Sequence, residues 1–129
     1  MAFILTPKNG EEIKINAWNW RPTLELLREA GLIDDDLYER MGTHGREARV
    51  DADMACRIAA FLDRRLGLMK PGERIRADLT TTDKPKKQVV FAPGIKVEDI
   101  DAVDLYSATY EWLLTFQDFC RRSGGFEVG

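Results

Sequence analysis

Side chains that could do acid–base or nucleophilic chemistry are few in this sequence. His44 is the only histidine, so a reaction that needs a histidine base would have to use it. The two serines, Ser107 and Ser123, do not stand in a nucleophile-elbow motif. Paired acids such as Asp34 and Asp36 stand where a helix is expected to start, and carboxylates at that place usually cap the helix. We therefore assign no catalytic residue, and the sequence favours a non-enzymatic protein.

Metal and cofactor motifs are also missing from the sequence. A zinc site needs three or four ligands that converge, whereas His44, Cys56 and Cys120 are widely separated along the chain. There is no Walker loop and no Gly-x-Gly-x-x-Gly segment for a nucleotide. We therefore predict no metal and no cofactor. Both cysteines fall on apolar positions of expected helices, and we interpret them as small buried residues in a reducing compartment.

The residues best suited to binding are Trp18, Trp20 and the adjacent Arg21. Positions i and i+2 of a strand point to the same side, so both indole rings would share one face. An exposed pair would form a binding platform, because aromatic residues and arginine dominate interaction hot spots, whereas an inward pair would belong to the core. Ile13 and Ile15 have the opposite parity to the tryptophans, so both interpretations stay open. The candidate binding set is Trp18, Trp20, Arg21 and His44.

Short elements near the N-terminus should position these residues. Asn9-Gly10 predicts a hairpin with a type I′ turn, which needs positive φ at both central positions, within a pair of strands over residues 3–16. A helix is predicted over residues 22–30, with Pro22 in its first position. Gly31 is expected to end that helix in a left-handed conformation.

Two more helices are expected in the first half of the chain. One should run from Asp34 to Met41, and the next from its N-cap Asp51 through residue 66, where apolar residues recur at spacings of three and four. Gly67 is predicted to end this helix in a left-handed conformation, with Leu68 packing back on it. Two segments follow: residues 70–85 are predicted as a loop and residues 88–92 as a strand.

The C-terminal stretch 97–123 is predicted to form the longest amphipathic helix. Its apolar surface is too wide for one packing face, which indicates burial from several sides. Residues 98–118 carry six acidic side chains and no basic one, whereas residues 40–76 carry nine basic and five acidic ones. We therefore expect this helix to dock on the arginine-rich region. Residues 126–129 alternate apolar and polar, as in a strand added beside the hairpin or a frayed tail.

Length and composition indicate one domain over residues 1–129. The net charge of −3 argues against a protein that coats nucleic acid. The first apolar run stops at Leu5, and no run is long enough to cross a bilayer. We expect a cytoplasmic protein with no nucleic-acid or membrane partner. The predicted fold class is α+β and mainly helical, with about four helices and a small antiparallel sheet from the hairpin and the strand near 88–92.

Two segments resemble a set of small uncharacterised bacterial proteins. The first is Asn16-Ala-Trp-Asn-Trp-Arg-Pro-Thr, and the second is the closing stretch that contains Phe119-Cys-Arg-Arg-Ser-Gly-Gly-Phe-Glu-Val. The resemblance covers most of the chain and implies a bacterial, cytosolic setting. It carries over no catalytic residue.

Two functional hypotheses follow. The first is a non-enzymatic domain that binds a protein partner, of which one specific form is an immunity-type inhibitor that blocks a partner toxin. The alternative is a small enzyme or ligand-binding protein whose pocket lies near Trp18, Trp20, Arg21 and His44. The first predicts an exposed apolar or single-sign patch, and the second predicts a concave site with convergent polar groups.

Overall fold

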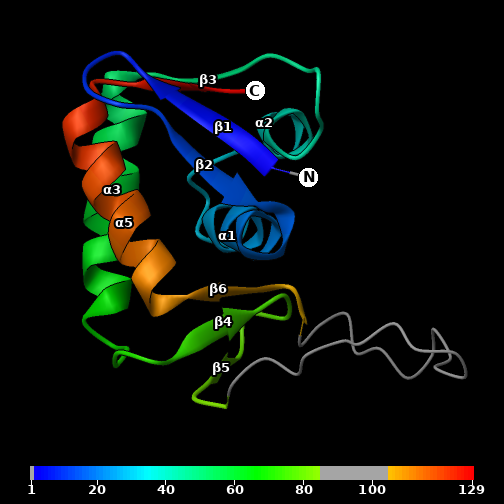
Figure 1. Ribbon diagram of the computed structural model, residues 1–129, viewed down its shortest axis with the longest axis vertical. Coiled ribbons are helices and arrows are strands. Elements are labelled where there is room, and N and C mark those ends of the chain that lie inside the picture. Colours follow the sequence, from blue (N-terminus) through cyan, green and yellow to red (C-terminus); the bar gives the residue numbers. More distant parts are fainter. Residues whose placement is uncertain (1, 85–104) are drawn as a thin grey trace, which may run out of the picture.

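Two antiparallel sheets lie at opposite ends of the molecule, with helices between and beside them (Figure 1). The computed structural model describes residues 2–84 and 105–129. Four helices fall in these residues, so the predicted α+β class is confirmed. None of the helices in this part of the chain is long and apolar enough to cross a membrane.

The larger sheet joins both ends of the chain. Its strand order is β2 (Ile13–Asn16), β1 (Ala2–Pro7), β7 (Phe126–Val128) and β3 (Ala48–Val50). Strand β7 pairs antiparallel with both β1 and β3, which confirms the interpretation of the tail as a strand beside the hairpin. Alternate residues such as Phe3 and Leu5 are buried, so one face of this sheet packs on the core.

The hairpin between β1 and β2 is confirmed, but its predicted turn is wrong. Gly10 has positive φ, and Asn9 does not. The last β1–β2 pair is Leu5 with Ile13, so the connection is longer than a two-residue turn. The loop is held instead by the C-terminal segment, because the N–H of Asn9 donates to the carbonyl of Ser123 at 2.8 Å.

Helix α1 (Ala17–Glu29) begins earlier than predicted. The side chain of Asn16 caps it by accepting a hydrogen bond from the N–H of Asn19, so Pro22 lies inside the helix and not at its start. The predicted end is confirmed. Gly31 has a φ of +75°, and the N–H of Leu32 donates to the carbonyl of Leu27 at 3.0 Å, as in a Schellman motif.

Helices α2 (Asp35–Met41) and α3 (Ala52–Leu66) begin at their predicted caps. The predicted end of α3 is wrong, because Gly67 keeps a right-handed φ of −62°. Leu68, which was expected to pack back on the helix, is 81% exposed. The chain makes a further turn, and it is Met69 that returns to the core.

The smaller sheet has two strands where a loop was predicted and a third where a helix was predicted. Its strand order is β5 (Thr81–Thr82), β4 (Arg74–Arg76) and β6 (Ser107–Thr109). Strands of two or three residues are too short to show a period, so the sequence pattern did not reveal them. The strand predicted at 88–92 lies outside the described residues.

The predicted uninterrupted helix over 97–123 is wrong, because residues 107–109 form β6. Helix α5 (Tyr110–Ser123) starts after Thr109, whose side chain accepts from the N–H of Trp112. With 14 residues it is one residue shorter than α3, so it is not the longest helix. Residues 97–104 lie outside the described part of the chain.

Helix α5 does pack along α3, as expected, and the two run side by side beside both sheets (Figure 1). The predicted pattern placed acidic residues on the C-terminal helix and basic residues on its neighbour, and the observed polar contacts are the reverse. Asp63 of α3 accepts a hydrogen bond from Gln117 at 2.9 Å and lies 4.0 Å from Arg121, so α3 supplies the acid and α5 the base. The acidic residues 98–104 lie outside the described residues, so their expected role in docking stays a prediction.

Aromatic side chains of α1, α5 and β7 meet in one core. Trp20 lies edge-on to Phe116 with ring centroids 5.4 Å apart, and Phe116 lies edge-on to Phe126 at 6.0 Å. The indole N–H of Trp112 donates to the hydroxyl of Thr23 at 2.9 Å, which ties α5 to α1. This core holds α1 in place, and α1 carries three of the four candidate binding residues.

Candidate binding surface

The two tryptophans of the candidate set point to different environments. They lie in the first turns of α1, and positions two apart on a helix face different sides. Trp20 is fully buried, and its indole N–H donates to the carbonyl of Met41 at 2.9 Å. Trp18 is 45% exposed. The prediction that both rings share one face of a strand is therefore wrong, because the Asn16 cap starts the helix before them.

The exposed ring of Trp18 is supported by another aromatic side chain. The rings of Trp18 and Tyr106 have centroids 4.5 Å apart and an interplanar angle of 37°. Tyr106 immediately precedes β6, so the pair joins α1 to the smaller sheet. Tyr106 lies within the stretch 97–123 that was predicted to be one helix. In the structure it is instead part of a small, partly exposed aromatic surface.

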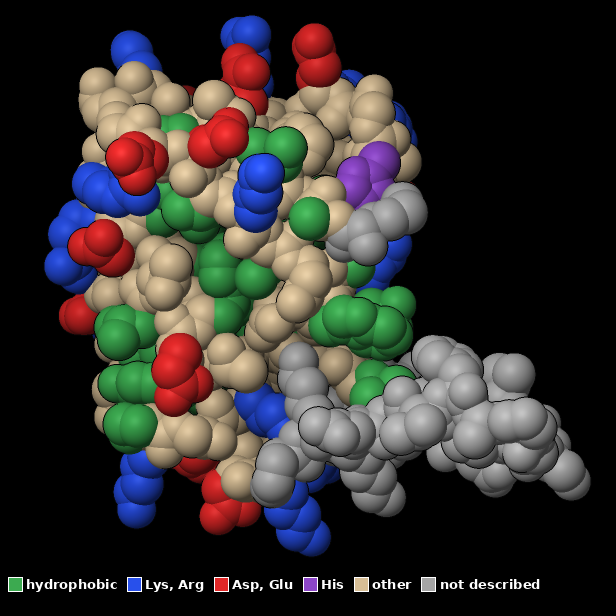
Figure 2. Space-filling model, in the orientation of Figure 1, with side chains coloured by type: hydrophobic (Ala, Val, Ile, Leu, Met, Phe, Trp, Pro, Cys, Tyr) green, Lys and Arg blue, Asp and Glu red, His purple; other side chains and the backbone are tan. Residues whose placement is uncertain are grey.

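Arg21 and His44, unlike the tryptophans, line one hollow between α1 and the end of α2. Its volume is about 470 Å³. The lining residues are Arg21, Leu24, Tyr38, Glu39, Gly42, Thr43 and His44. The histidine (purple) lies at the surface in Figure 2. The structure thus brings together two of the four candidate residues, places Trp20 in the core and leaves Trp18 outside this lining.

Contacts within the protein hold the walls of this hollow. The ring of His44 stacks on that of Phe3, with centroids 4.1 Å apart and planes 16° apart. The hydroxyl of Tyr38 donates to the carboxylate of Glu25 on α1, and the guanidinium of Arg28 lies 4.1 Å from the centre of the Tyr38 ring. Burial, followed by the bond to Glu25, raises the pKa of Tyr38 above its ordinary value.

Three ionisable side chains of the hollow form no polar contact with the other described residues. Arg21, Glu39 and His44 make no side-chain hydrogen bond or ion pair with any other residue that the structure describes. By contrast, the nearby bases Arg28 and Arg40 pair with acids on their own helices at 2.8 and 3.0 Å. The hollow can therefore offer a cation, a carboxylate and an imidazole to a small polar ligand.

Spacing along α1 is the sequence signal that could have pointed to this face. Residues three and four apart lie on one side of a helix, so Trp18, Arg21, Glu25 and Arg28 share it. Predicting that helix to start at Pro22 hid this pattern. Tyr38 and Glu39 were missed because nothing in the sequence of α2 indicates that this helix packs against α1.

A second hollow, of about 700 Å³, lies where β1, β3 and β7 meet the start of α3. Its most prominent charged pair is already satisfied, because Arg49 and Glu127 form an ion pair at 2.9 Å between adjacent strands. Close packing surrounds it: a Cβ atom on Gly125 would lie 2.9 Å from the carbonyl of Val50. We interpret this region as a structural junction.

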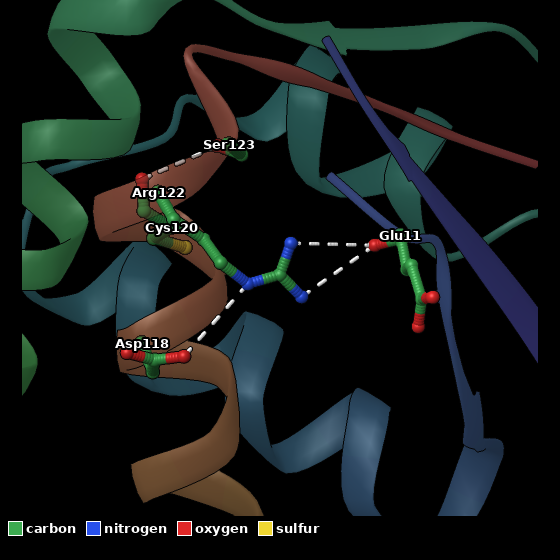
Figure 3. Close-up of polar contacts among 5 residues, drawn as sticks. All are labelled: Glu11, Asp118, Cys120, Arg122 and Ser123. Carbon is green, nitrogen blue, oxygen red and sulfur yellow. Dashed lines mark hydrogen bonds and ion pairs between the residues drawn. The ribbon is translucent and has the colours of Figure 1, made fainter. Parts of the chain in front are cut away.

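The hairpin loop is fastened to α5 by an arginine near that junction. Figure 3 shows Arg122 reaching from the helix toward Glu11, whose carbonyl lies 3.4 and 3.5 Å from the two terminal guanidinium nitrogens. Asp118, one turn earlier, lies 3.8 Å from the Nε of Arg122. A Cβ atom on Gly10 would lie 2.5 Å from the same guanidinium. These contacts position the loop and leave Arg122 engaged.

The cysteines differ from the prediction at one of the two positions. Cys120 is buried in α5 as expected, and burial raises the pKa of its thiol. Cys56 is exposed on α3, beside a hollow of about 280 Å³ that Asp63 and Arg121 also line. Neither is in a disulfide. Within residues 2–84 and 105–129 no group of three His, Cys, Asp or Glu side chains could hold a metal ion.

No protein-family model, curated protein or solved structure matches this chain.

Proposed function

We propose that this protein is a non-enzymatic interaction domain that binds a protein partner. The contact region is centred on the aromatic pair of Trp18 and Tyr106, with Arg21 one helical turn further along α1. Tryptophan, tyrosine and arginine are the residue types that contribute most to protein–protein hot spots.

The exposure of Trp18 carries this proposal. The other two tryptophans, Trp20 and Trp112, are 0% and 8% exposed, whereas Trp18 is 45% exposed. A large ring that stays in contact with water on folding forgoes much of the free energy that its burial would provide. Its contact with the tilted ring of Tyr106 restricts the motion of the indole, which lowers the entropy lost when a partner covers it.

A finer form of the proposal is an immunity-type inhibitor in the cytoplasm of a bacterium. The small, acidic chain, with a sequence pI of about 5.2, and its resemblance to small bacterial proteins support this form. Two free cysteines are consistent with a reducing compartment. We propose neither a nucleic-acid nor a membrane partner.

The test is affinity capture from the native cytoplasm, comparing the wild-type chain with Trp18→Ala. Leu114→Ala is the matched control, because Leu114 is an apolar residue of similar exposure, 46%, on α5. Wild type and Leu114→Ala should each recover the same partner at a stoichiometric level by mass spectrometry. Trp18→Ala should lose that partner while keeping the wild-type circular dichroism spectrum. Recovery of no stoichiometric partner, or full recovery by Trp18→Ala, would overturn the proposal.

The alternative hypothesis is a ligand-binding protein, and one observation favours it. Arg21 and His44 line one hollow, although Trp18 does not line it and Trp20 is buried. A pocket built from all four candidate residues does not form. A smaller polar site around Arg21 and His44 keeps the ligand-binding hypothesis open.

A further inference from the structure

We propose that the hollow between α1 and α2 binds a free α-amino acid with an apolar side chain, its carboxylate held by Arg21 and its ammonium by Glu39. This inference develops the ligand-binding alternative. It does not depend on the protein interaction proposed for Trp18 and Tyr106, since neither residue lines the hollow.

Charge is the first argument. Arg21 comes from α1 and Glu39 from α2, and both line the hollow without forming an ion pair with each other or with another described residue. An anion would be attracted by the guanidinium and repelled by the carboxylate. A cation would be attracted by the carboxylate and repelled by the guanidinium. A zwitterion offers each wall a group of opposite charge, and charge-assisted hydrogen bonds are the stronger kind.

Hydrogen-bonding capacity is the second argument. The hydroxyl of Thr43 donates its proton to the carbonyl of Glu39 at 2.7 Å, so its remaining lone pairs can only accept. An ammonium is a pure donor and therefore suits a site that contains this hydroxyl and the Glu39 carboxylate. The imidazole of His44 adds a group that can donate to a carboxylate.

Size and apolar surface are the third argument. A hollow of about 470 Å³ falls within the range of small-molecule sites, roughly 300–1,000 Å³. The half-buried ring of Tyr38 supplies apolar lining, whereas Leu24, which also lines the hollow, is 1% exposed. An apolar or aromatic side chain on the ligand would cover that surface, which favours phenylalanine as the first probe.

The walls are already in place before any ligand arrives. The Trp20 indole bonded to the Met41 carbonyl joins the end of α2 to α1, and the Tyr38 hydroxyl bonded to Glu25 joins the helices again. Phe3 fixes the plane of the His44 ring from the other side. The backbone of the two walls therefore loses little conformational freedom on binding.

The experiment is a titration of the ¹⁵N-labelled protein, followed by NMR, with three ligands. L-Phenylalanine carries both charges, L-phenylalaninamide lacks the carboxylate, and N-acetyl-L-phenylalanine lacks the ammonium. Phenylalanine should shift amide signals around Gly42 and Thr43, and each analogue should bind roughly tenfold more weakly, because it lacks one charge-assisted contact.

Variants assign each contact to its residue. Arg21→Gln should lose most of the preference for phenylalanine over its amide, and Glu39→Gln should lose most of the preference for phenylalanine over its N-acetyl derivative. Arg46→Gln and Glu47→Gln are the controls, since both side chains are exposed and neither lines the hollow; they should behave as wild type. Absence of binding, shifts confined to other surfaces, or equal binding of all three ligands by wild type would overturn the proposal. The outcome is separate from the partner capture with Trp18→Ala, which measures a different surface.

Discussion

Trp18 and Trp20 stand two positions apart and meet opposite environments. Trp20 is enclosed by aromatic rings and donates a hydrogen bond to Met41, whereas Trp18 is partly exposed and contacts the tilted ring of Tyr106. One residue type thus serves the surface at position 18 and the core two residues later, within the same turn of the helix. The difference follows from where the helix begins, which Asn16 sets.

Trp20→Phe should destabilise the protein much more than Trp18→Phe. The change at 20 leaves the buried Met41 carbonyl without its donor and removes part of a fully buried ring, with an expected loss of about 2–4 kcal/mol. The change at 18 keeps an aromatic ring on Tyr106 and should cost under about 0.5 kcal/mol. Urea unfolding of both variants measures the difference. Similar losses would mean that the two rings are equally buried.

Cys56 and Cys120 should react differently with a thiol reagent. In the folded protein at neutral pH, one maleimide per chain is expected, at Cys56, because it is exposed. Cys120 is 1% exposed and its pKa is raised, so it should react only after unfolding. Peptide mapping by mass spectrometry, with and without denaturant, identifies the labelled residue. Labelling of Cys120 in the folded chain would contradict this arrangement.

Helix ends show how local signals can succeed or fail at the scale of one element. Gly31 and Gly67 both follow an amphipathic helix, and both were expected to be left-handed. Gly31 has a φ of +75°, whereas Gly67 has a φ of −62°. After Gly67 the chain must continue turning to bury Met69, and this tertiary demand outweighs the local preference.

Replacing these glycines with alanine should therefore have different consequences. Gly31→Ala should lower the free energy of unfolding by about 1 kcal/mol, since a side chain disfavours positive φ even though a Cβ there would contact nothing. Gly67→Ala should change it by less than about 1 kcal/mol, because its φ suits any residue while a Cβ there would lie 3.3 Å from the carbonyl of Arg64. Thermal unfolding of the two variants side by side tests the pair. If Gly67→Ala lost as much unfolding free energy as Gly31→Ala, the right-handed conformation of Gly67 would be contradicted.

At the scale of the whole molecule, the C-terminal strand completes the larger sheet. Strand β7 lies between β1 and β3, and its N- and C-terminal residues, Phe126 and Val128, are buried. The three residues of β7 therefore join β1, at the beginning of the chain, to β3, near its middle. A segment of this kind is expected to be essential for folding despite its terminal position.

Truncation after Gly125 should lower the free energy of unfolding by about 3–6 kcal/mol, the contribution expected from burying two large apolar side chains. Glu127→Ala is the control, because that side chain is exposed and its ion pair with Arg49 lies at the surface; it should cost under about 1 kcal/mol. Guanidinium unfolding measures both variants. A truncated chain as stable as wild type would contradict the central place of β7 in the sheet.

Several features of this fold were predictable from the sequence because they depend on neighbouring residues. Asp34 and Asp51 were identified as helix caps, and Gly31 as a helix end, because capping and positive φ depend on neighbours within a few positions. The apolar spacing of α3 was equally readable, since it repeats over four turns. These signals were enough to predict the α+β class and three of the helices in outline.

Other features depend on partners far away in the chain. Strands β3, β4, β5 and β6 have two or three residues each, and only pairing with distant segments makes them strands. The candidate site has the same origin. Arg21 and His44 face one hollow because the Trp20–Met41 hydrogen bond and the Tyr38–Glu25 contact hold α2 against α1. Patterns over a few neighbouring residues cannot predict such contacts, because the free energy that favours them arises only when the whole core is packed.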